Sequence, residues 1–410
     1  MESGSLPPVV VDQGAHTMKV GFAGEAGPRR RVPTCTVRDR GGRRYVGDQL
    51  SECAEPVGLA VQRPFDRGYP VNFDQLRTLW DRVLGGEVLG ADAWQRALLL
   101  TEPTHCMPPL QNAMDELVFE ACGFREYATA SAAALAMAAH RGSVVGRDAF
   151  AGLVVDAGYS FSHVAPVFDG VQVNHAVKRV DVGGKVLTNY LKDAVSFRSL
   201  NVMDETNLMN EVKQLLCYVS DDFMRDMRVT QMRGKRNTVK REYVMPDYSQ
   251  NNRGYVRGDP RKWQDARAYE GDASRRGPEQ SLILNNERIM GPELLFSPQD
   301  IGLQQAGIPE AIVQAVSSFP EAAQEEMYAN VVLVGGCTLI PGYRERVEVE
   351  LRKEAPSDME VRVHVPESPI DTAWQGGSAF ASSVDFSRCC VTKAEYEESG
   401  SELCRRRFMS

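Results

Sequence analysis

Two short apolar runs end in the same polar pattern, one near the start of the chain and one near its middle. Residues 9–11 (Val-Val-Val) lead into Asp12-Gln13-Gly14, and residues 153–155 (Leu-Val-Val) lead into Asp156-Ala157-Gly158. A second apolar run follows each turn, so each copy predicts two buried strands joined by a tight hairpin turn. Such turns present backbone N–H groups to anions, and their Asp can hold a metal ion. Two matching copies favour two related lobes facing a phosphate chain over two unrelated hairpins.

Helical and strand patterns alternate along the rest of the chain. The strand pattern occurs at 96–100 and at 331–334, where it runs into Gly335-Gly336. Apolar residues recur at helical spacing in residues 74–84, 111–122, 128–140, 181–195, 204–218 and 344–353. This alternation predicts an α/β fold of mixed sheets covered by helices.

The bulk composition is that of an ordinary folded protein. The chain has 410 residues, 43% hydrophobic and 25% charged, which is enough for two lobes with cores of their own. No apolar run reaches the roughly 18 residues of a membrane-spanning helix, and no secretory signal is seen. Nine Cys without a CxxC pair favour a reducing compartment. The six His are scattered, so no metal-ligand cluster is predicted.

Charge is unevenly distributed. The net charge is −8, yet residues 228–276 contain 13 Lys/Arg and 6 Asp/Glu. Residues 247–279 lose periodicity and are rich in Gly, Pro, Arg and Asn, which predicts an irregular or partly disordered insertion. Local excess charge can mark a partner-binding segment. Composition alone favours a solvated loop.

Several stretches, taken in order, resemble the landmarks of actin from about residue 8 to 408. They are Phe22-Ala23-Gly24, Tyr45-Val46-Gly47-Asp48, Thr101-Glu102-Pro103, Leu216-Cys217-Tyr218-Val219, Asn286-Glu287-Arg288 and residues 335–342. Departures from actin, such as residues 156–163 and 297–302, resemble a nuclear branch of actin-related proteins. The insertion before Asn286 also resembles that branch, and makes the chain roughly 30 residues longer there than conventional actin.

The resemblance implies the two-lobed fold shared by actin, sugar kinases and heat-shock ATPases, with ATP or ADP and Mg in the cleft. The first, small lobe is expected at 1–146 plus 371–410, and the second, large lobe at 147–370. The resemblance also implies a subunit of a SWR/SRCAP-type chromatin remodelling complex that exchanges the Z histone variant into nucleosomes. The partners implied are the remodeller ATPase, a zinc-finger HIT-domain subunit and, through the complex, the nucleosome. The nucleus is the expected location, with the cytoplasm as an alternative.

Nine residues match nucleotide-binding positions of actin. Asp12 and Asp156 would also hold hydrated Mg, which keeps most of its waters and needs few protein ligands. A compact Lys ammonium suits a phosphate contact. The nine residues are Asp12, Gly14, Lys19, Asp156, Gly158, Gly183, Lys213, Gly335 and Gly336.

Other cleft positions differ from actin, and no catalytic residue is expected. Ala132 stands where actin has the Gln that orients the attacking water. Ala15 and His16 replace Ser and Gly in the first turn, and Tyr159 and Ser160 replace Asp and Gly in the second. Phosphoryl transfer depends mainly on positioning and electrostatics. ATPase activity is therefore expected to be weak or absent, with nucleotide binding retained or weakened.

Self-assembly is not expected either. Only residues 37–44 lie between Thr36 and Tyr45, where actin has a long loop with a hydrophobic tip that docks into the next subunit. An interface loses its central apolar anchor without that loop.

The alternative functions are a filament-forming actin-like ATPase and a small-molecule kinase of the same superfamily. The GxxxxGK[ST] loop is absent, which argues against a P-loop NTPase. Three Arg runs, at 29–31, 43–44 and 405–407, could contact DNA phosphates, but solvated faces or protein contacts are favoured.

Overall fold

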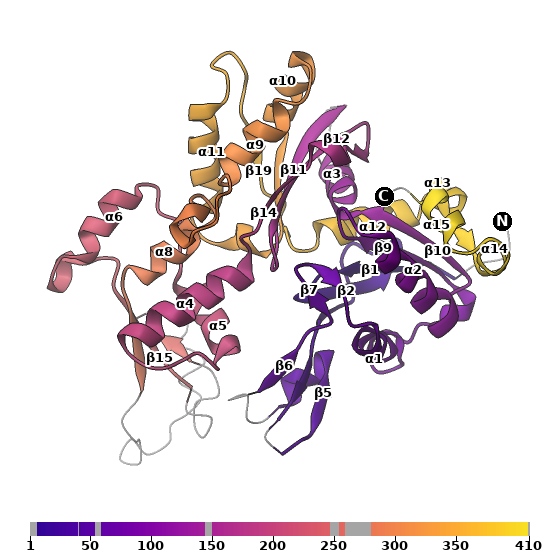
Figure 1. Ribbon diagram of the computed structural model, residues 1–410, viewed down its shortest axis with the longest axis horizontal. Helices are drawn as coiled ribbons and strands as arrows, with labels where there is room; N and C mark the ends of the chain where they lie inside the picture. The colour runs from indigo at the N-terminus through magenta and orange to yellow at the C-terminus, as the bar shows by residue number, and fades with distance from the viewer. Residues whose placement is uncertain are drawn as a thin grey trace.

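The computed structural model describes residues 6–39, 41–53, 59–143, 150–246, 254–258 and 280–408. Two six-stranded sheets form the centres of two halves, which are seen side by side in Figure 1. Each sheet is built around a hairpin of the kind predicted from the repeated Asp-x-Gly pattern. The remaining sheets are smaller and lie at the edges of these halves.

The first large sheet has the order β20-β10-β9-β1-β2-β3. Strands β1 and β2 pair antiparallel with Val11 opposite Val20, and β1 pairs in parallel with β9. The strands are β1 Val9–Gln13, β2 Thr17–Phe22, β3 Arg30–Pro33, β9 Ala97–Glu102, β10 Glu126–Ser131 and β20 Val391–Thr392.

The second large sheet repeats this plan. Strands β11 and β12 pair antiparallel with Val155 opposite Val164, and β11 pairs in parallel with β18. The order is β13-β12-β11-β18-β19, with β14 paired to β12. The strands are β11 Ala151–Ala157, β12 Ser162–Phe168, β13 Val171–Gln172, β14 Lys178–Val180, β18 Val331–Val334 and β19 Val363–His364. Because the two hairpins occupy equivalent places, their turns lie at equivalent ends of the two sheets.

Three small sheets contain the remaining strands. One joins β4 Thr36–Arg38, β5 Arg44–Val46 and β6 Ala60–Gln62, and another joins β7 Phe65–Asp66 and β8 Tyr69–Pro70. The third joins β15 Arg241–Val244, β16 Tyr255–Val256 and β17 Ser281–Leu284. The prediction of an irregular 247–279 insertion is therefore wrong for residues 255–256, which pair with β15. Residues 247–253 and 259–279 lie outside the described residues.

Helices cover the faces of both sheets, as expected for this fold class. In the first half they are α1 Phe73–Leu84, α2 Pro108–Glu116, α13 Val384–Cys389, α14 Lys393–Ser399 and α15 Ser401–Arg407. The second half contains α4 Gly184–Arg198, α5 Thr206–Leu216, α6 Phe223–Thr230, α8 Glu287–Glu293, α9 Ile308–Val316, α10 Glu321–Ala329 and α11 Tyr343–Glu354, and of these α9, α10 and α11 pack directly on its large sheet. None of the helices in the part of the chain that the structure describes is both long and apolar enough to cross a membrane.

Two helices, α3 (Ala132–Ser143) and α12 (Thr372–Ala381), join the halves. Leu135 of α3 packs with Trp374 of α12 and Val10 of the first sheet, whereas Met137 of α3 packs with Val154 of the second. The predicted helix at 128–140 is wrong in its first turn, because Glu126–Ser131 is a strand. Pairing with β9 and burial in the core override the helix propensity of its alanines. The predicted α/β two-lobed fold is confirmed, and the boundaries at 146/147 and 370/371 stay predictions.

Candidate functional site: a cleft at the two hairpin turns

A cleft of about 560 Å³ opens between the β1–β2 and β11–β12 turns. It is lined by eight of the nine residues predicted to bind nucleotide, and Gly183 is the exception. The neighbouring Gly184 lines the cleft instead. A Cβ on Gly183 would lie 2.6 Å from the backbone N of Phe161, so Gly183 shapes the second turn from behind. The eight are Asp12, Gly14, Lys19, Asp156, Gly158, Lys213, Gly335 and Gly336.

Strand register brings together the first ion pair of the cleft. Asp12 is opposite Lys19 in the β1–β2 hairpin, and Lys19 Nζ donates to Asp12 Oδ2 at 2.8 Å. The second carboxylate oxygen accepts a hydrogen bond from Thr101 Oγ1 at 2.9 Å. Asp12 is only 7% exposed, so this carboxylate is fixed by partners on two strands. Lys19 therefore has its charge balanced within the protein.

The second acid of the cleft, Asp156, lies near the end of β11, next to the hairpin turn and beside Gly335. Burial raises the pKa of Asp156 to about 6, with the Lys19 charge opposing and the Asp12 charge adding to this rise. Gly335 has φ +88°, and a Cβ there would lie 2.6 Å from Asp156 Oδ1. Only glycine fits this close approach with this backbone conformation. The Gly335 turn and the Asp156 carboxylate therefore form one wall of the cleft.

The other end of the cleft is organised by Lys213 of α5. Its Nζ donates to Gly184 O, Thr188 Oγ1 and Asn210 Oδ1, each at 2.9 Å. These partners use all three ammonium protons and tie α4 to α5. Burial lowers the pKa of Lys213. The sequence placed Lys213 at the cleft, but gave no sign of this internal network.

His16 and Tyr159, one from each turn, are in contact. Their ring centroids lie 4.9 Å apart, and the guanidinium of Arg63 sits 5.0 Å from the Tyr159 ring centroid. Arg63 Nη1 also donates to the carbonyl oxygens of Ala15 and His16. Burial, followed by the charges of Arg63, Lys213 and Lys19, lowers the pKa of His16 to about 3. His16 is therefore neutral at pH 7, and the two turns meet through aromatic rings.

No amide replaces the water-orienting glutamine at the start of α3. Ala132 and Ala133 line the cleft there, and their methyl groups cannot accept or donate a hydrogen bond. Gln13 also lines the cleft, but its Oε1 accepts from the indole Nε1 of Trp80 at 2.8 Å. The first residues of α3 therefore supply no side-chain group that could position an attacking water.

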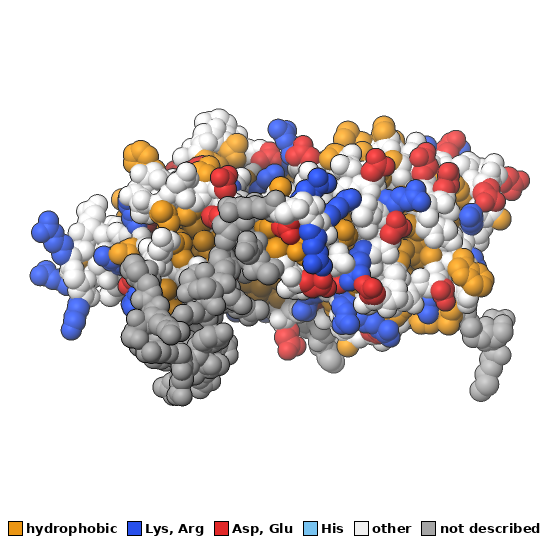
Figure 2. All heavy atoms as spheres, turned by 90° about the horizontal axis from the view of Figure 1, so that it is seen from below, with side chains coloured by type: hydrophobic (Ala, Val, Ile, Leu, Met, Phe, Trp, Pro, Cys, Tyr) orange, Lys and Arg blue, Asp and Glu red, His pale blue; other side chains and the backbone are white. Residues whose placement is uncertain are grey.

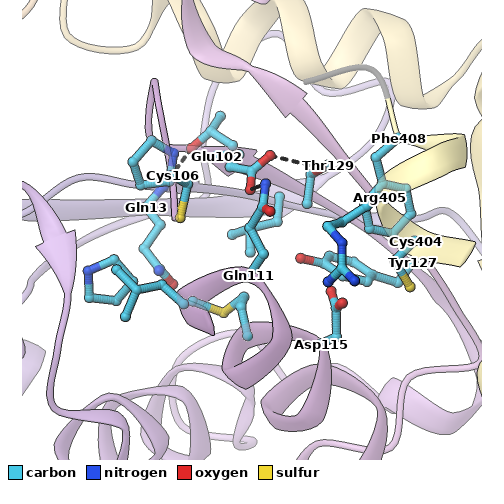
Figure 3. A pocket seen from close by; sticks show the side chains of 16 residues that line it. Gln13, Glu102, Cys106, Gln111, Asp115, Tyr127, Thr129, Cys404, Arg405 and Phe408 are labelled. Atoms are coloured by element: carbon cyan, nitrogen blue, oxygen red, sulfur yellow. Dashed lines mark hydrogen bonds between the residues drawn. The ribbon is translucent and has the colours of Figure 1, made fainter. Parts of the chain in front are cut away.

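A small, partly open cavity lies behind the cleft and shares the wall formed by Gln13 and residues 101–103 (Figure 3). The Glu102 side chain lies in this wall, and its Oε1 accepts a hydrogen bond from Gln111 Nε2 at 2.6 Å. Asp115 and Arg405 lie at the opposite side of the cavity (Figure 3). Burial raises the pKa of Asp115 to about 7, with a hydrogen bond from Ser401 opposing and the Glu102 charge adding to this rise.

The donor set of the cleft fits a Mg-bound nucleotide. The carboxylates of Asp12 and Asp156 suit hydrated Mg, and Lys19 with the glycine turns suits phosphate. Bound Mg would neutralise phosphate charge. In the part of the chain described, no group of three or more His, Cys, Asp or Glu could hold a metal by itself. A metal would therefore take its further ligands from water and the nucleotide.

Sequence reasoning missed Arg63 and Gly184. Arg63 reaches its partners across 47 and 48 residues of chain, and no local pattern signals such a contact. Gly184 could have been found, because it adjoins Gly183 in the same turn.

Comparison with known proteins shows the family to which the chain belongs. The actin family model matches residues 3–409. Actin-related protein 6 of Oryza sativa subsp. indica is 40% identical, over 98% of this chain and 98% of its own. That of Arabidopsis thaliana is 40% identical over 98% and 99%, and that of Drosophila melanogaster is 37% identical over 96% and 97%. The chain therefore belongs to the actin family, and within it to the actin-related protein 6 group.

Proposed function

We propose that this chain is a non-catalytic subunit of a SWR/SRCAP-type nuclear chromatin remodelling complex that exchanges the Z histone variant into nucleosomes. Its role there is structural, docking partner subunits. The proposal that the subunit is non-catalytic rests on one observation. Ala132 lines the cleft at the position where actin places its water-orienting glutamine. Since phosphoryl transfer depends on positioning, this loss lowers hydrolysis far more than binding.

Nucleotide binding is part of the proposal, with ATP or ADP and Mg as the ligand. Asp12 and Asp156 would hold hydrated Mg, and Lys19 would face the phosphates. Lys213 and the Gly335-Gly336 turn would flank the nucleoside. The ion pair of Lys19 with Asp12 and the contact of His16 with Tyr159 must adjust to admit phosphates, which weakens the expected affinity.

The short β4–β5 hairpin supports a monomer within a heteromeric assembly. Its exposed side chains include Arg38, Arg43 and Arg44, and like charges repel a second copy of the chain. The alternative, a filament-forming ATPase, would need an apolar anchor at this place. We expect the purified chain to stay in the supernatant when it is centrifuged at high speed under salt and Mg conditions that polymerise actin. A pellet containing most of the protein would favour the alternative.

The partners proposed are the remodeller ATPase, a zinc-finger HIT-domain subunit and, through them, the nucleosome. The deciding experiment is affinity purification of the endogenous chain from nuclear extract, followed by mass spectrometry of the intact assembly. Recovery in a fixed ratio with a remodeller ATPase and a HIT-domain subunit supports the proposal. Recovery alone or as a homopolymer overturns it.

The insertion at 247–279 is the segment proposed to dock a partner subunit. It is basic and absent from conventional actin, while the chain elsewhere keeps the actin pattern. Deleting residues 259–279 should reduce recovery of a partner subunit in the same purification. Undiminished recovery of every subunit would remove this idea and leave the rest of the proposal standing.

A further inference from the structure

A cluster of exposed cations projects from the second half of the molecule, and none of its members lines the cleft. All lie within residues 227–241, which contain no Asp, Glu or aromatic residue. Figure 2 shows Lys and Arg side chains projecting at the end of the molecule where α6 lies in Figure 1. This basic tip consists of Arg228, Arg233, Lys235, Arg236, Lys240 and Arg241.

The neighbouring carboxylates that the structure describes have other partners. Glu242 pairs with Arg257 at 3.1 Å rather than with the adjacent Arg241. Asp226 accepts hydrogen bonds from Tyr218 and Ser220 and pairs with Arg225. Within the described part of the chain, the guanidiniums of Arg228 and Arg241 donate to nearby backbone carbonyls. Among the residues that the structure describes, the six charges therefore have no carboxylate partner.

Two of the three Arg-rich runs noted in the sequence, at 29–31 and 405–407, are largely paired with carboxylates, whereas Arg43-Arg44 is an exposed run of only two. Arg29 pairs with Glu25 and Arg31 with Asp371. Arg406 and Arg407 of α15 also pair with carboxylates of the chain. Because these charges are already balanced, the basic tip is the stronger candidate for an anionic partner.

A rigid backbone presents the basic tip. Asn237 Nδ2 donates to Thr230 O at 3.0 Å and to Asn285 Oδ1 at 2.9 Å. Asn237 Oδ1 accepts from the backbone N–H groups of Val239 and Lys240 at 3.1 and 2.9 Å. Val239 is buried, at 3% exposure. Since the backbone is already ordered, binding at the tip incurs little ordering cost.

We propose that the basic tip binds the phosphate backbone of double-stranded DNA. Six exposed cations within one segment that contains no Asp or Glu suit a phosphate backbone, and release of its counterions supplies the driving force. A protein partner would call for aromatic or apolar anchors at the centre of the surface. Met232, at 45%, and Met224 of α6, at 66%, are exposed here, and residues 227–241 contain no aromatic residue. The inference does not rest on the remodelling role proposed above.

The test measures binding of the full chain to a fluorescent 30-base-pair duplex by anisotropy at several salt concentrations. The affinity should fall steeply with salt, by a slope of about 0.9 in log K against log salt for each phosphate contacted. The triple variant Arg233→Glu, Lys235→Glu, Arg236→Glu should reduce that slope by about 2 to 3 and weaken binding at least tenfold. Its side chains have no described partners, so its thermal unfolding should match that of the wild type.

A matched control makes the same change in net charge elsewhere. Arg38→Glu, Arg43→Glu, Arg44→Glu alters the exposed β4–β5 hairpin and should leave the slope within about 1 of the wild type. An equal loss in the control would mean non-specific attraction and overturn the assignment to the basic tip. Tighter binding to a 20-residue polyglutamate than to the duplex at equal salt would assign the tip to an acidic protein segment. No binding to the duplex by the wild type also overturns the proposal.

Discussion

The imidazole of His16 packs against the phenol ring of Tyr159, with centroids 4.9 Å apart, and so joins the turns of two hairpins in different sheets. Glycine and aspartate stand at these positions in the resemblance to conventional actin. A contact between protein side chains thus spans the place where the two turns would face the phosphates. The Arg63 guanidinium lies over the Tyr159 ring of the second turn and donates to the carbonyl oxygens of Ala15 and His16 in the first turn, which stiffens the contact between the turns.

Replacing His16 with glycine should strengthen nucleotide binding. His16→Gly removes the ring that meets Tyr159 and leaves Asp12 and Lys19 in place. We expect the affinity for Mg-ATP to rise about tenfold, or about 1.4 kcal/mol, measured by titration with a fluorescent ATP analogue. His175→Gly changes an exposed histidine that does not line the cleft and should have no effect. Unchanged or weaker binding by His16→Gly would show that the ring does not oppose the phosphates.

Restoring an amide at the start of α3 should restore turnover. In Ala132→Gln, the new side chain extends into the cleft from the position that actin uses to orient water. We expect the rate of ATP hydrolysis at saturating Mg-ATP to rise at least tenfold while the affinity changes little, because the amide acts on the attacking water. Ala134→Gln lies on the same helix, does not line the cleft, and should hydrolyse no faster than the wild type. A wild-type rate already equal to that of Ala132→Gln would contradict the assignment.

The repeated Asp-x-Gly turns made much of this fold predictable. Continuous apolar runs located β1 and β11, and the pairing register in the structure places Lys19 opposite Asp12. Residues 128–131 were misread because alanine fits both a helix and a small-residue strand, and only pairing with β9 decides between them. Helix propensity is a weak prior, which tertiary context overrides.

Contacts between distant segments could not be predicted in the same way. Arg63 meets the first turn only because β6 and β7 bring it there, and Lys213 finds its acceptors on α4 rather than on its own helix alone. Such side-chain partners depend on how elements pack, which a single sequence does not encode by spacing. A glycine, by contrast, can mark a turn from sequence alone. Gly335 has the positive φ that favours glycine.

The packing of α12 on α3 should tolerate no added methyl group at Gly376. A Cβ on Gly376 would collide with the carbonyl oxygen of Leu135, which cannot move without displacing the helix. Gly376→Ala should lower the free energy of unfolding by about 2–4 kcal/mol, measured by urea denaturation. Gly86→Ala, where nothing lies within 4 Å of the added Cβ, should change it by less than about 1 kcal/mol. Equal stability of the two variants would mean that the helices separate easily.

Asp115 in the small cavity should make stability depend on pH. Its pKa in the folded protein is raised to about 7 from an ordinary value of 3.8, so the folded state binds this proton more tightly than the unfolded chain. The free energy of unfolding therefore falls as pH rises from about 4 to 7, and the full penalty applies above pH 7. Asp115→Asn removes this contribution, so between pH 5 and pH 8 the wild type should lose about 2–4 kcal/mol more than the variant in urea denaturation. Contributions from Asp156 and His16 are common to both proteins and cancel in the comparison. Asp358→Asn, at an exposed position, should follow the wild type, and parallel pH profiles for Asp115→Asn and the wild type would refute the prediction.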